Sequence, residues 1–196
     1  MLISYRQSPT LIEIAQYLYH TATSKKAEYI SYMDSDDKEP KPLLYINEVE
    51  EESIEWMAKR ILEIYNAYGN SIPSIAVFLP EESQLQNFSQ KLGNIDELAD
   101  VDIKVMACNN GQVLGEENTV RVFSLDYIKG LEFEAVFFHN IDEVVNNSSA
   151  DLMFKNLYVG LSRASFYLGI TSKSEIEEIS KLPNILDGNK NNWKII

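Results

Sequence analysis

Four apolar runs of strand length constrain the fold of this chain more than any other feature of its sequence. They are SIAVFLP (74–80), TVRVFSL (119–125), EAVFFHNI (134–141) and FYLGIT (166–171). Short, nearly unbroken apolar runs are typical of strands that are buried on both faces. Because segments with helical spacing alternate with such runs, we predict crossover connections between parallel strands. The sequence therefore predicts an α/β fold, a mainly parallel sheet with helices on both faces.

The segments around these runs place apolar residues at the three- and four-residue spacing of helices. The clearest stripe lies between 54 and 68, and it follows three glutamates that favour the positive end of a helix dipole. A helix is expected to start at Ser8-Pro9, since serine can cap and proline fits the first turn. Further helices are predicted near 85–92, 150–162 and 174–182, and short strands at LLYI (43–46) and DIKVMA (102–107). In such sheets, functional residues gather in loops at the carboxyl ends of strands.

Composition limits the class of protein. Of the 196 residues, 45% are hydrophobic and 24% are charged, a balance that suits one soluble globular domain. No apolar run approaches the roughly 20 residues that cross a bilayer, and no secretory signal opens the chain. We therefore expect a cytoplasmic protein with no membrane partner. The single Cys108 has no internal disulfide partner and alone forms no metal site, so no metal ligands are predicted.

The net charge of −13 argues against a broad basic surface. Affinity for nucleic-acid backbones comes from lysine and arginine side chains that neutralise phosphates. Any contact of this chain with a nucleic acid is therefore expected to be local, or to use basic surface from another domain or chain.

Three polar segments stand out, and each has an ordinary structural explanation. They are SYRQ (4–7), SLDYIKGLEF (124–133) and YVGLSRA (158–164). The Tyr-Arg pair of the first is compatible with a surface turn. In the second, Lys129-Gly130 fits a turn in which glycine adopts a positive φ, and Glu132 fits a solvent-facing strand position. In the third, Arg163 is favourable at the negative end of its helix.

Taken together, the three segments indicate a function. In this order, the chain resembles the second RecA-like domain of superfamily I helicases of the UvrD/Rep type. That family's fourth motif has the form N-Y-R-S, its fifth T-x-H-x-x-K-G-L-E-F before a buried strand, and its sixth Y-V-A/G-x-T-R-A. The resemblance runs from Leu2 to about Thr171. It implies a RecA-like three-layer fold of the P-loop NTPase type.

The resemblance also implies which residues bind a nucleotide. Arg6 and Arg163 would reach the γ-phosphate of ATP, with Arg163 as the arginine finger. Tyr5 would stack on the adenine and Glu132 would hydrogen-bond the ribose, while Lys129 and Gly130 would shape the loop that positions Glu132. Arginine suits this task because its planar fork donates two hydrogen bonds to phosphate oxygens and keeps its proton. ATP and Mg²⁺ would lie between this domain and an N-terminal RecA-like domain of the same parent protein.

The implied strand contacts depart from the family pattern. Ser124 stands where the family has a threonine near the DNA strand. Asp126 replaces the family's histidine, and its carboxylate would repel a DNA phosphate. Ser4 replaces the family's asparagine in the fourth motif, which keeps a hydrogen-bonding side chain but shortens it. Single-stranded DNA is the implied partner, and strand binding by this domain itself is expected to be weak.

Other parts of a complete motor are absent from these residues. The sequence has no G-x-x-x-x-G-K-[ST] loop to bind phosphates, and no acidic strand end to bind Mg²⁺. The large insertion that many family members carry before the fifth motif is also missing. We expect residues 1–183 to form the domain, 184–196 to form a loose polar tail, and the phosphate-binding domain to lie upstream. The chain alone is expected to be inactive and to hold no cofactor.

The predicted function is the C-terminal motor domain of an ATP-dependent DNA helicase or translocase. Two alternatives stay open. The fold could serve as a non-enzymatic interaction or regulatory module, or the motor could move on RNA or move without unwinding. An intact phosphate-binding lysine upstream favours a motor, and its loss favours the module.

Overall fold

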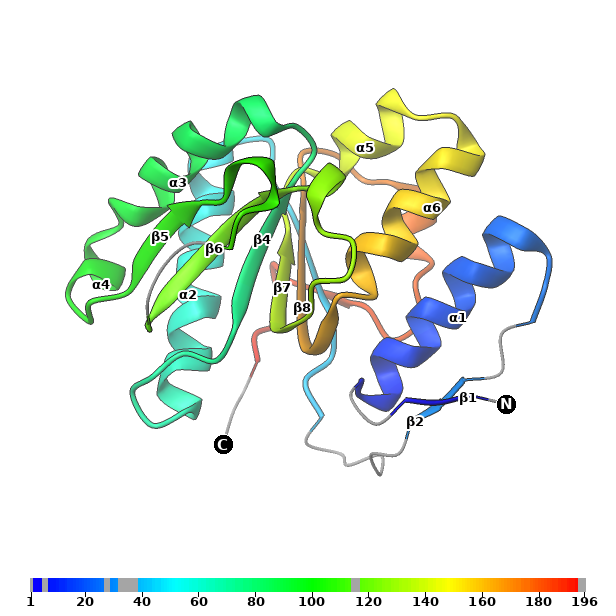
Figure 1. Ribbon diagram of the computed structural model, residues 1–196, viewed down its shortest axis with the longest axis horizontal. Coiled ribbons are helices and arrows are strands. Elements are labelled where there is room, and N and C mark those ends of the chain that lie inside the picture. Colours follow the sequence, from blue (N-terminus) through cyan, green and yellow to red (C-terminus); the bar gives the residue numbers. More distant parts are fainter. Residues whose placement is uncertain (1, 5–6, 27–28, 32–38, 114–116, 194–196) are drawn as a thin grey trace.

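The computed structural model describes residues 2–4, 7–26, 29–31, 39–113 and 117–193. Seven strands in these ranges form one sheet: β3 (Leu43–Ile46), β4 (Ile75–Leu79), β5 (Lys104–Ala107), β6 (Thr119–Ser124), β7 (Phe133–Phe138), β8 (Ala164–Ser172) and β9 (Leu186–Asp187). Their spatial order is β5-β6-β4-β7-β8-β3-β9, and every pair is parallel. We call the two rims of this sheet the carboxyl rim and the amino rim, after the strand ends that form them. The carboxyl rim is uppermost in Figure 1.

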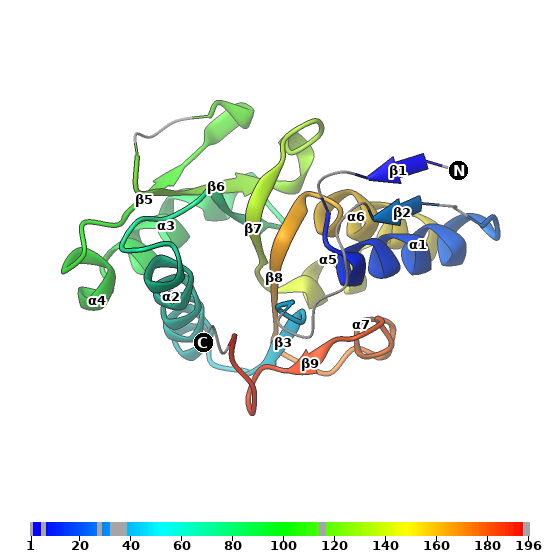
Figure 2. The ribbon, with the colours of Figure 1, turned by 90° about the horizontal axis from the view of Figure 1, so that it is seen from below.

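Helices cover both faces of the sheet (Figures 1 and 2). They are α1 (Pro9–Thr23), α2 (Glu50–Ala67), α3 (Leu85–Gly93), α4 (Asp96–Ala99), α5 (Ile141–Asn147), α6 (Ala150–Leu161) and α7 (Glu177–Ser180). Helices α2, α3 and α4 pack on one face of the sheet, and α1, α5, α6 and α7 pack on the opposite face. In the described ranges, none of these helices has the length and apolar character needed to cross a membrane. The predicted three-layer α/β architecture of RecA-like type is confirmed.

The central strand β4 shows why the apolar runs were informative. All five of its side chains are buried. Ala76 and Phe78 belong to the core on the α1/α6 face, whereas Ile75, Val77 and Leu79 belong to the core on the α2/α3 face. Complete burial of a large apolar side chain contributes about 1.5–3 kcal/mol. A strand that serves two cores therefore carries no alternation of polar and apolar residues, and the sequence shows none.

The N-terminal region adds a small sheet that the sequence pattern did not predict. Strand β1 (Leu2–Ser4) pairs in parallel with β2 (Tyr29–Ser31), beside α1. Helix α1 begins at Pro9 as predicted, but the side chain of Ser8 makes no capping hydrogen bond. The carboxylate of Glu39 caps the helix instead, because its Oε1 accepts a hydrogen bond of 2.9 Å from the backbone N–H of Thr10.

The C-terminal segment corrects a prediction. Residues 184–193 are anchored to the domain at the buried Gly188 and Trp193, so this part of the predicted loose tail 184–196 is fixed in place, while residues 194–196 lie outside the described ranges. Trp193 is 4% exposed, and its indole Nε1 donates a hydrogen bond of 3.0 Å to the carbonyl of Lys41. The Nε1 of Trp56 similarly donates to the carbonyl of Gly188 at 3.0 Å. These contacts join residues more than a hundred positions apart, so the polar composition of the segment did not reveal them. The last helix, α7, is also shorter than the predicted 174–182.

Candidate functional site

Arg163 lies at the amino rim, directly before β8. Its guanidinium is held by three oxygen atoms: Nε donates to the carbonyl of Val159 at 3.0 Å, Nη1 to the carbonyl of Leu131 at 3.3 Å, and Nη2 to the hydroxyl of Ser162 at 3.2 Å. No carboxylate among the described residues forms an ion pair with it. A guanidinium has five N–H donors, so two remain for another group. The half-buried side chain is thus oriented by the protein, and no carboxylate of the described ranges neutralises its charge.

The loop before β7 lies against Arg163. The backbone N–H of Phe133 donates to the carbonyl of Arg163 at 3.0 Å, and the carbonyl of Leu131 accepts from the guanidinium. Glu132, which is exposed, therefore sits in the chain between two residues that bind Arg163. Gly130 has φ +85°, as predicted for a turn glycine, and Lys129 beside it is exposed. The structure thus brings together the predicted ribose-binding and phosphate-binding segments.

Gln7 connects the first polar segment to the same place. Its side-chain Nε2 donates to the carbonyl of Ser162 at 3.1 Å and to the carbonyl of Ala164 at 3.0 Å, on either side of Arg163. The backbone N–H of Ser8 adds a hydrogen bond of 2.9 Å to the carbonyl of Ser165. Sequence reasoning did not assign a role to Gln7, although it is the last residue of the SYRQ segment. The predicted nucleotide contacts at 5 and 6, Tyr5 and Arg6, lie outside the described residues.

The two predicted strand-binding residues lie at the opposite rim. Ser124 ends β6 at the carboxyl rim, and Asp126 follows in a 3₁₀ turn, η3 (Leu125–Tyr127). The hydroxyl of Ser124 is buried and accepts a hydrogen bond of 3.3 Å from the backbone N–H of Asp126, which is exposed. Loop 125–132 then returns to the amino rim, where β7 begins (Figure 1). The expectation that functional residues gather at the carboxyl ends therefore applies to only part of the predicted set.

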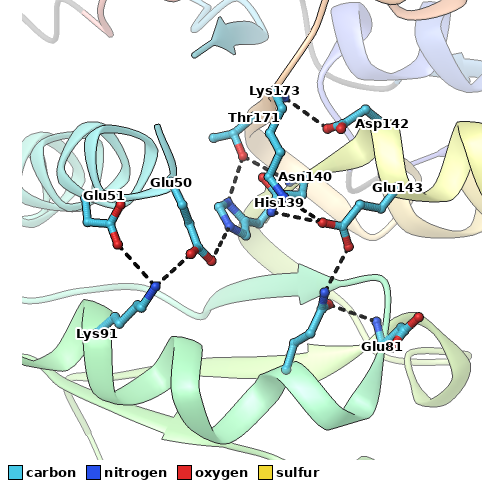
Figure 3. A network of polar contacts seen from close by, with 11 residues as sticks. Glu50, Glu51, Glu81, Lys91, His139, Asn140, Asp142, Glu143, Thr171 and Lys173 are labelled. Carbon is cyan, nitrogen blue, oxygen red and sulfur yellow. Dashed lines mark hydrogen bonds and ion pairs between the residues drawn. The ribbon is translucent and has the colours of Figure 1, made fainter. Parts of the chain in front are cut away.

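A second polar network occupies the carboxyl rim, and the sequence pattern did not predict it (Figure 3). His139 follows β7 directly and is 2% exposed. Its Nε2 lies 3.8 Å from Oε1 of Glu50, the first residue of α2, and Oε2 of Glu50 forms an ion pair of 2.7 Å with Lys91. In the sequence, the signal for this network is a strand-like run that ends in His139-Asn140. The partners Glu50 and Lys91 lie in helices far away in the chain.

The charges at this rim are mutually compensated. The imidazole of His139, together with the Lys91 ammonium, lowers the pKa of Glu50 to about 2. Burial lowers the pKa of His139 and favours its neutral form, and the nearby Glu50 only partly opposes this. Burial raises the pKa of Glu143, but hydrogen bonds from Lys173 and Gln84 outweigh it, so the pKa is lowered overall. Glu50 and Glu143 are thus each paired with a lysine, Lys91 and Lys173, whereas Arg163 at the amino rim forms no ion pair with a described carboxylate.

Comparison with known proteins establishes the fold of the chain. No protein-family model and no curated protein matches it. Its structure is similar to a solved structure, the C-terminal domain of a possible DNA helicase from Lactobacillus plantarum WCFS1, with a TM-score of 0.61. The similarity covers 92% of this chain and 94% of that one, at 16% sequence identity. At this identity the similarity shows a shared fold.

Proposed function

We propose that this chain is the second motor domain of an ATP-dependent DNA helicase or translocase. In the parent protein, ATP with Mg²⁺ would bind between the amino rim and an N-terminal RecA-like domain. The observation that carries this proposal is the convergence of three distant segments around Arg163. Gln7, Leu131 and Ser162 each hydrogen-bond the side chain or the flanking carbonyls of this arginine. The shared fold with the C-terminal domain of a possible DNA helicase supports it.

The arrangement suits phosphoryl transfer. Catalysis of this reaction depends mainly on positioning and on positive charge placed where charge redistributes over the γ-phosphate. Arg163 is oriented by three oxygen acceptors, which limits the side-chain freedom that binding would remove. Its remaining N–H donors would contact the γ-phosphate. Glu132, exposed on the adjacent loop, would bind the ribose. Roles for Tyr5 on the adenine and Arg6 on the γ-phosphate rest on the resemblance alone.

Single-stranded DNA would pass along the carboxyl rim at η3. Asp126 is exposed there, whereas the buried hydroxyl of Ser124 shapes the turn. We propose that Ser124 acts by fixing this turn, since its oxygen already accepts the N–H of Asp126. Closure of the two domains on ATP and reopening after hydrolysis would then step the pair along the strand.

Two observations favour a second candidate, an interaction or regulatory module without motor activity. Asp126 places an exposed carboxylate where the family contacts a phosphate, and the net charge is −13. Such a module would not hydrolyse ATP in the parent protein, whereas a motor would hydrolyse it faster in the presence of single-stranded DNA.

Strand-stimulated ATP hydrolysis by the parent protein tests the proposal. Arg163→Ala is expected to lower the rate by about 10³- to 10⁵-fold, the effect of removing an arginine finger. Strand affinity is expected to stay within a few-fold of wild type. Arg121→Ala is the matched control, because Arg121 lies within β6, away from the segments that meet at Arg163. An Arg163→Ala protein that keeps the hydrolysis rate of this control would refute the assignment.

A further inference from the structure

The carboxyl rim contains a pocket of about 270 Å³ at the centre of the sheet. It is lined by Glu50, Leu79, Ser83, Gln84, Asn87, Phe88, His139, Asn140, Glu143 and Lys173. The neighbouring strands β4 and β7 end here, and their connections diverge. The chain leaves β4 through α3 toward β5 on one side, and leaves β7 through α5 and α6 toward β8 on the other. In open α/β sheets, ligands bind in the crevice at such a switch point.

The imidazole of His139 is aimed into this pocket with one nitrogen unsatisfied. Its Nδ1 lies 2.8 Å from the hydroxyl oxygen of Thr171, which also accepts a hydrogen bond of 3.1 Å from the backbone N–H of Asn140. Thr171 is fully buried, so its own proton has an acceptor only if it is donated to Nδ1. The proton of the neutral ring therefore sits on Nε2. That buried Nε2 makes no hydrogen bond within the part of the chain that the structure describes.

The carboxylate of Glu50 lies opposite Nε2 of His139, and its Oε1 is available to accept a hydrogen bond. Its Oε2 is bound by Lys91, while its Oε1 lies 3.8 Å from Nε2 of His139, beyond hydrogen-bonding distance. An oxygen atom about 2.8 Å from each of them completes a triangle, and only a group that both donates and accepts fits there. A hydroxyl is such a group. A lone cation or anion satisfies only one of the two partners.

The rest of the lining favours a neutral ligand with more than one hydroxyl. Glu143 already accepts hydrogen bonds of 2.9 Å from Lys173 and 2.9 Å from Gln84, so this wall carries little free charge. Asn87 also lines the pocket, and its side-chain amide has no hydrogen-bond partner within the described ranges. The amide offers a donor and an acceptor to a second hydroxyl. Buried apolar side chains of Leu79 and Phe88 complete the lining.

We propose that this switch-point pocket binds the vicinal hydroxyls of a pentose, carried by a free sugar or by a nucleoside. Glu50 would accept from the first hydroxyl and His139 would donate to it, while Asn87 would bind the second. The proposal does not rest on the proposed motor function, because it concerns the opposite rim and residues that do not contact Arg163.

The imidazole nitrogen signals of the chain in solution test the proposal, since only two histidines are present. His20, exposed on α1, is an internal control. Ribose, adenosine and 2′-deoxyadenosine are titrated separately to about 10 mM, the range in which millimolar affinities are measurable. We expect His139 to be the Nε2–H form and its signals to shift saturably with adenosine, while those of His20 stay fixed. An equal response to ribose would identify the sugar as sufficient, and 2′-deoxyadenosine should bind at least about tenfold more weakly, because one hydroxyl is lost.

Variants separate binding from folding. Glu50→Gln should weaken adenosine binding by about tenfold or more, since it removes a charged acceptor. Glu51→Gln is the matched control, because Glu51 binds the same Lys91 but does not line the pocket. If no saturable shift of His139 occurs with any of the three compounds, or if both variants bind as the wild type does, the pocket holds solvent only and the proposal is wrong.

Discussion

The two rims of the sheet differ in the partners of their charged side chains. At the amino rim, Arg163 is bound by two backbone carbonyls and a hydroxyl, with no carboxylate partner within the described residues. At the carboxyl rim, Glu50 pairs with Lys91 and Glu143 pairs with Lys173. Carbonyl dipoles orient a guanidinium without cancelling its charge, whereas a carboxylate cancels it. Arg163 at the amino rim is therefore suited to an anionic ligand, whereas the pocket lined by Glu50 and Glu143 at the carboxyl rim is suited to a neutral one.

The difference has an energetic reason. A half-buried cation without a counterion loses part of its hydration, and hydrogen bonds to carbonyls only partly compensate for that loss. An incoming phosphate restores the missing Coulomb attraction and forms charge-assisted hydrogen bonds. Paired carboxylates gain nothing comparable from an anion. The comparison thus supports the proposal that the phosphates of a nucleotide bind at the amino rim.

Substitution of two glutamines, one at each rim, is expected to give the largest difference in kcat between the rims in the parent protein. Gln7 bridges the carbonyls on either side of Arg163, and Gln84 binds Glu143. We expect Gln7→Ala to lower kcat for ATP hydrolysis by about 10²-fold with little change in KM, because a small misplacement of a catalytic group has an effect of this size. Gln84→Ala should leave kcat within a few-fold of wild type.

Steady-state kinetics of both variants distinguish positioning from loss of folding. A merely structural role for Gln7 would lower the fraction of folded protein, measured by circular dichroism, and leave kcat per folded molecule unchanged, whereas a positioning role lowers kcat per folded molecule. Equal losses of kcat in the two variants would show that the rims do not differ in this respect.

We expect the free energy of unfolding to fall as the pH is lowered, and the loss that begins at the highest pH to come from His139 at the carboxyl rim. The folded-state pKa of His139 is lowered by burial, so the unfolded chain takes up a proton that the folded chain does not. Its contribution to stability is complete above pH 6.5 and is lost as the pH falls below that value, with a slope of at most about 1.4 kcal/mol per pH unit. Glu50, whose pKa is lowered to about 2, adds a loss between about pH 4.5 and 2.

Urea unfolding of the chain between pH 7.5 and 5 measures the histidine effect, with pH values chosen around the ordinary range of histidine. The other charged groups near His139 are Glu50, Glu143 and Lys173. His139→Gln should flatten the fall in unfolding free energy over this interval, whereas His20→Gln, at an exposed position on α1, should not. An unchanged slope in His139→Gln would contradict the buried, neutral imidazole.

The smallest expected effect concerns the strand path at η3. Asp126→His in the parent protein should tighten binding of a short single-stranded oligonucleotide by a few-fold at low salt, because it removes repulsion between a carboxylate and a phosphate. The gain should shrink as salt rises, since screening weakens interactions between exposed charges. Fluorescence anisotropy at two salt concentrations measures it. A variant that binds no better at low salt would place this turn outside the nucleic-acid path.

The fold class could be predicted from the sequence because the main strands are recognisable from their own residues. The runs that became β4, β6, β7 and β8 are nearly unbroken in apolar residues, since most of their side chains are buried on the two faces of the sheet. The packed tail was not predictable, because Trp193 is buried by residues far away in the chain. The pairing of β1 with β2 likewise depends on a short contact between distant segments, which leaves no periodic pattern.

The candidate site was predictable only where residues act as parts of a motif. Arg163 and Glu132 were predicted from two quoted segments, and the structure places these segments side by side. The carboxyl-rim pocket combines the start of α2, the end of β7 and the start of α5. Each contributes one or two polar residues that look like ordinary surface positions in the sequence. Their shared location follows from the strand order, which local patterns do not specify.

The ratio of affinities for a non-hydrolysable ATP analogue and for ADP, measured on the parent protein, tests the central claim most directly. Both nucleotides carry the same ribose and base, so the ratio reports the γ-phosphate alone. If Arg163 binds that phosphate, Arg163→Ala should reduce the ratio by about 10- to 100-fold, the effect of losing a charge-assisted hydrogen bond or two. Glu143→Gln, at the carboxyl rim, should leave the ratio unchanged. A ratio that Arg163→Ala leaves intact, or that Glu143→Gln reduces as strongly, would contradict the assignment of the γ-phosphate to the amino rim.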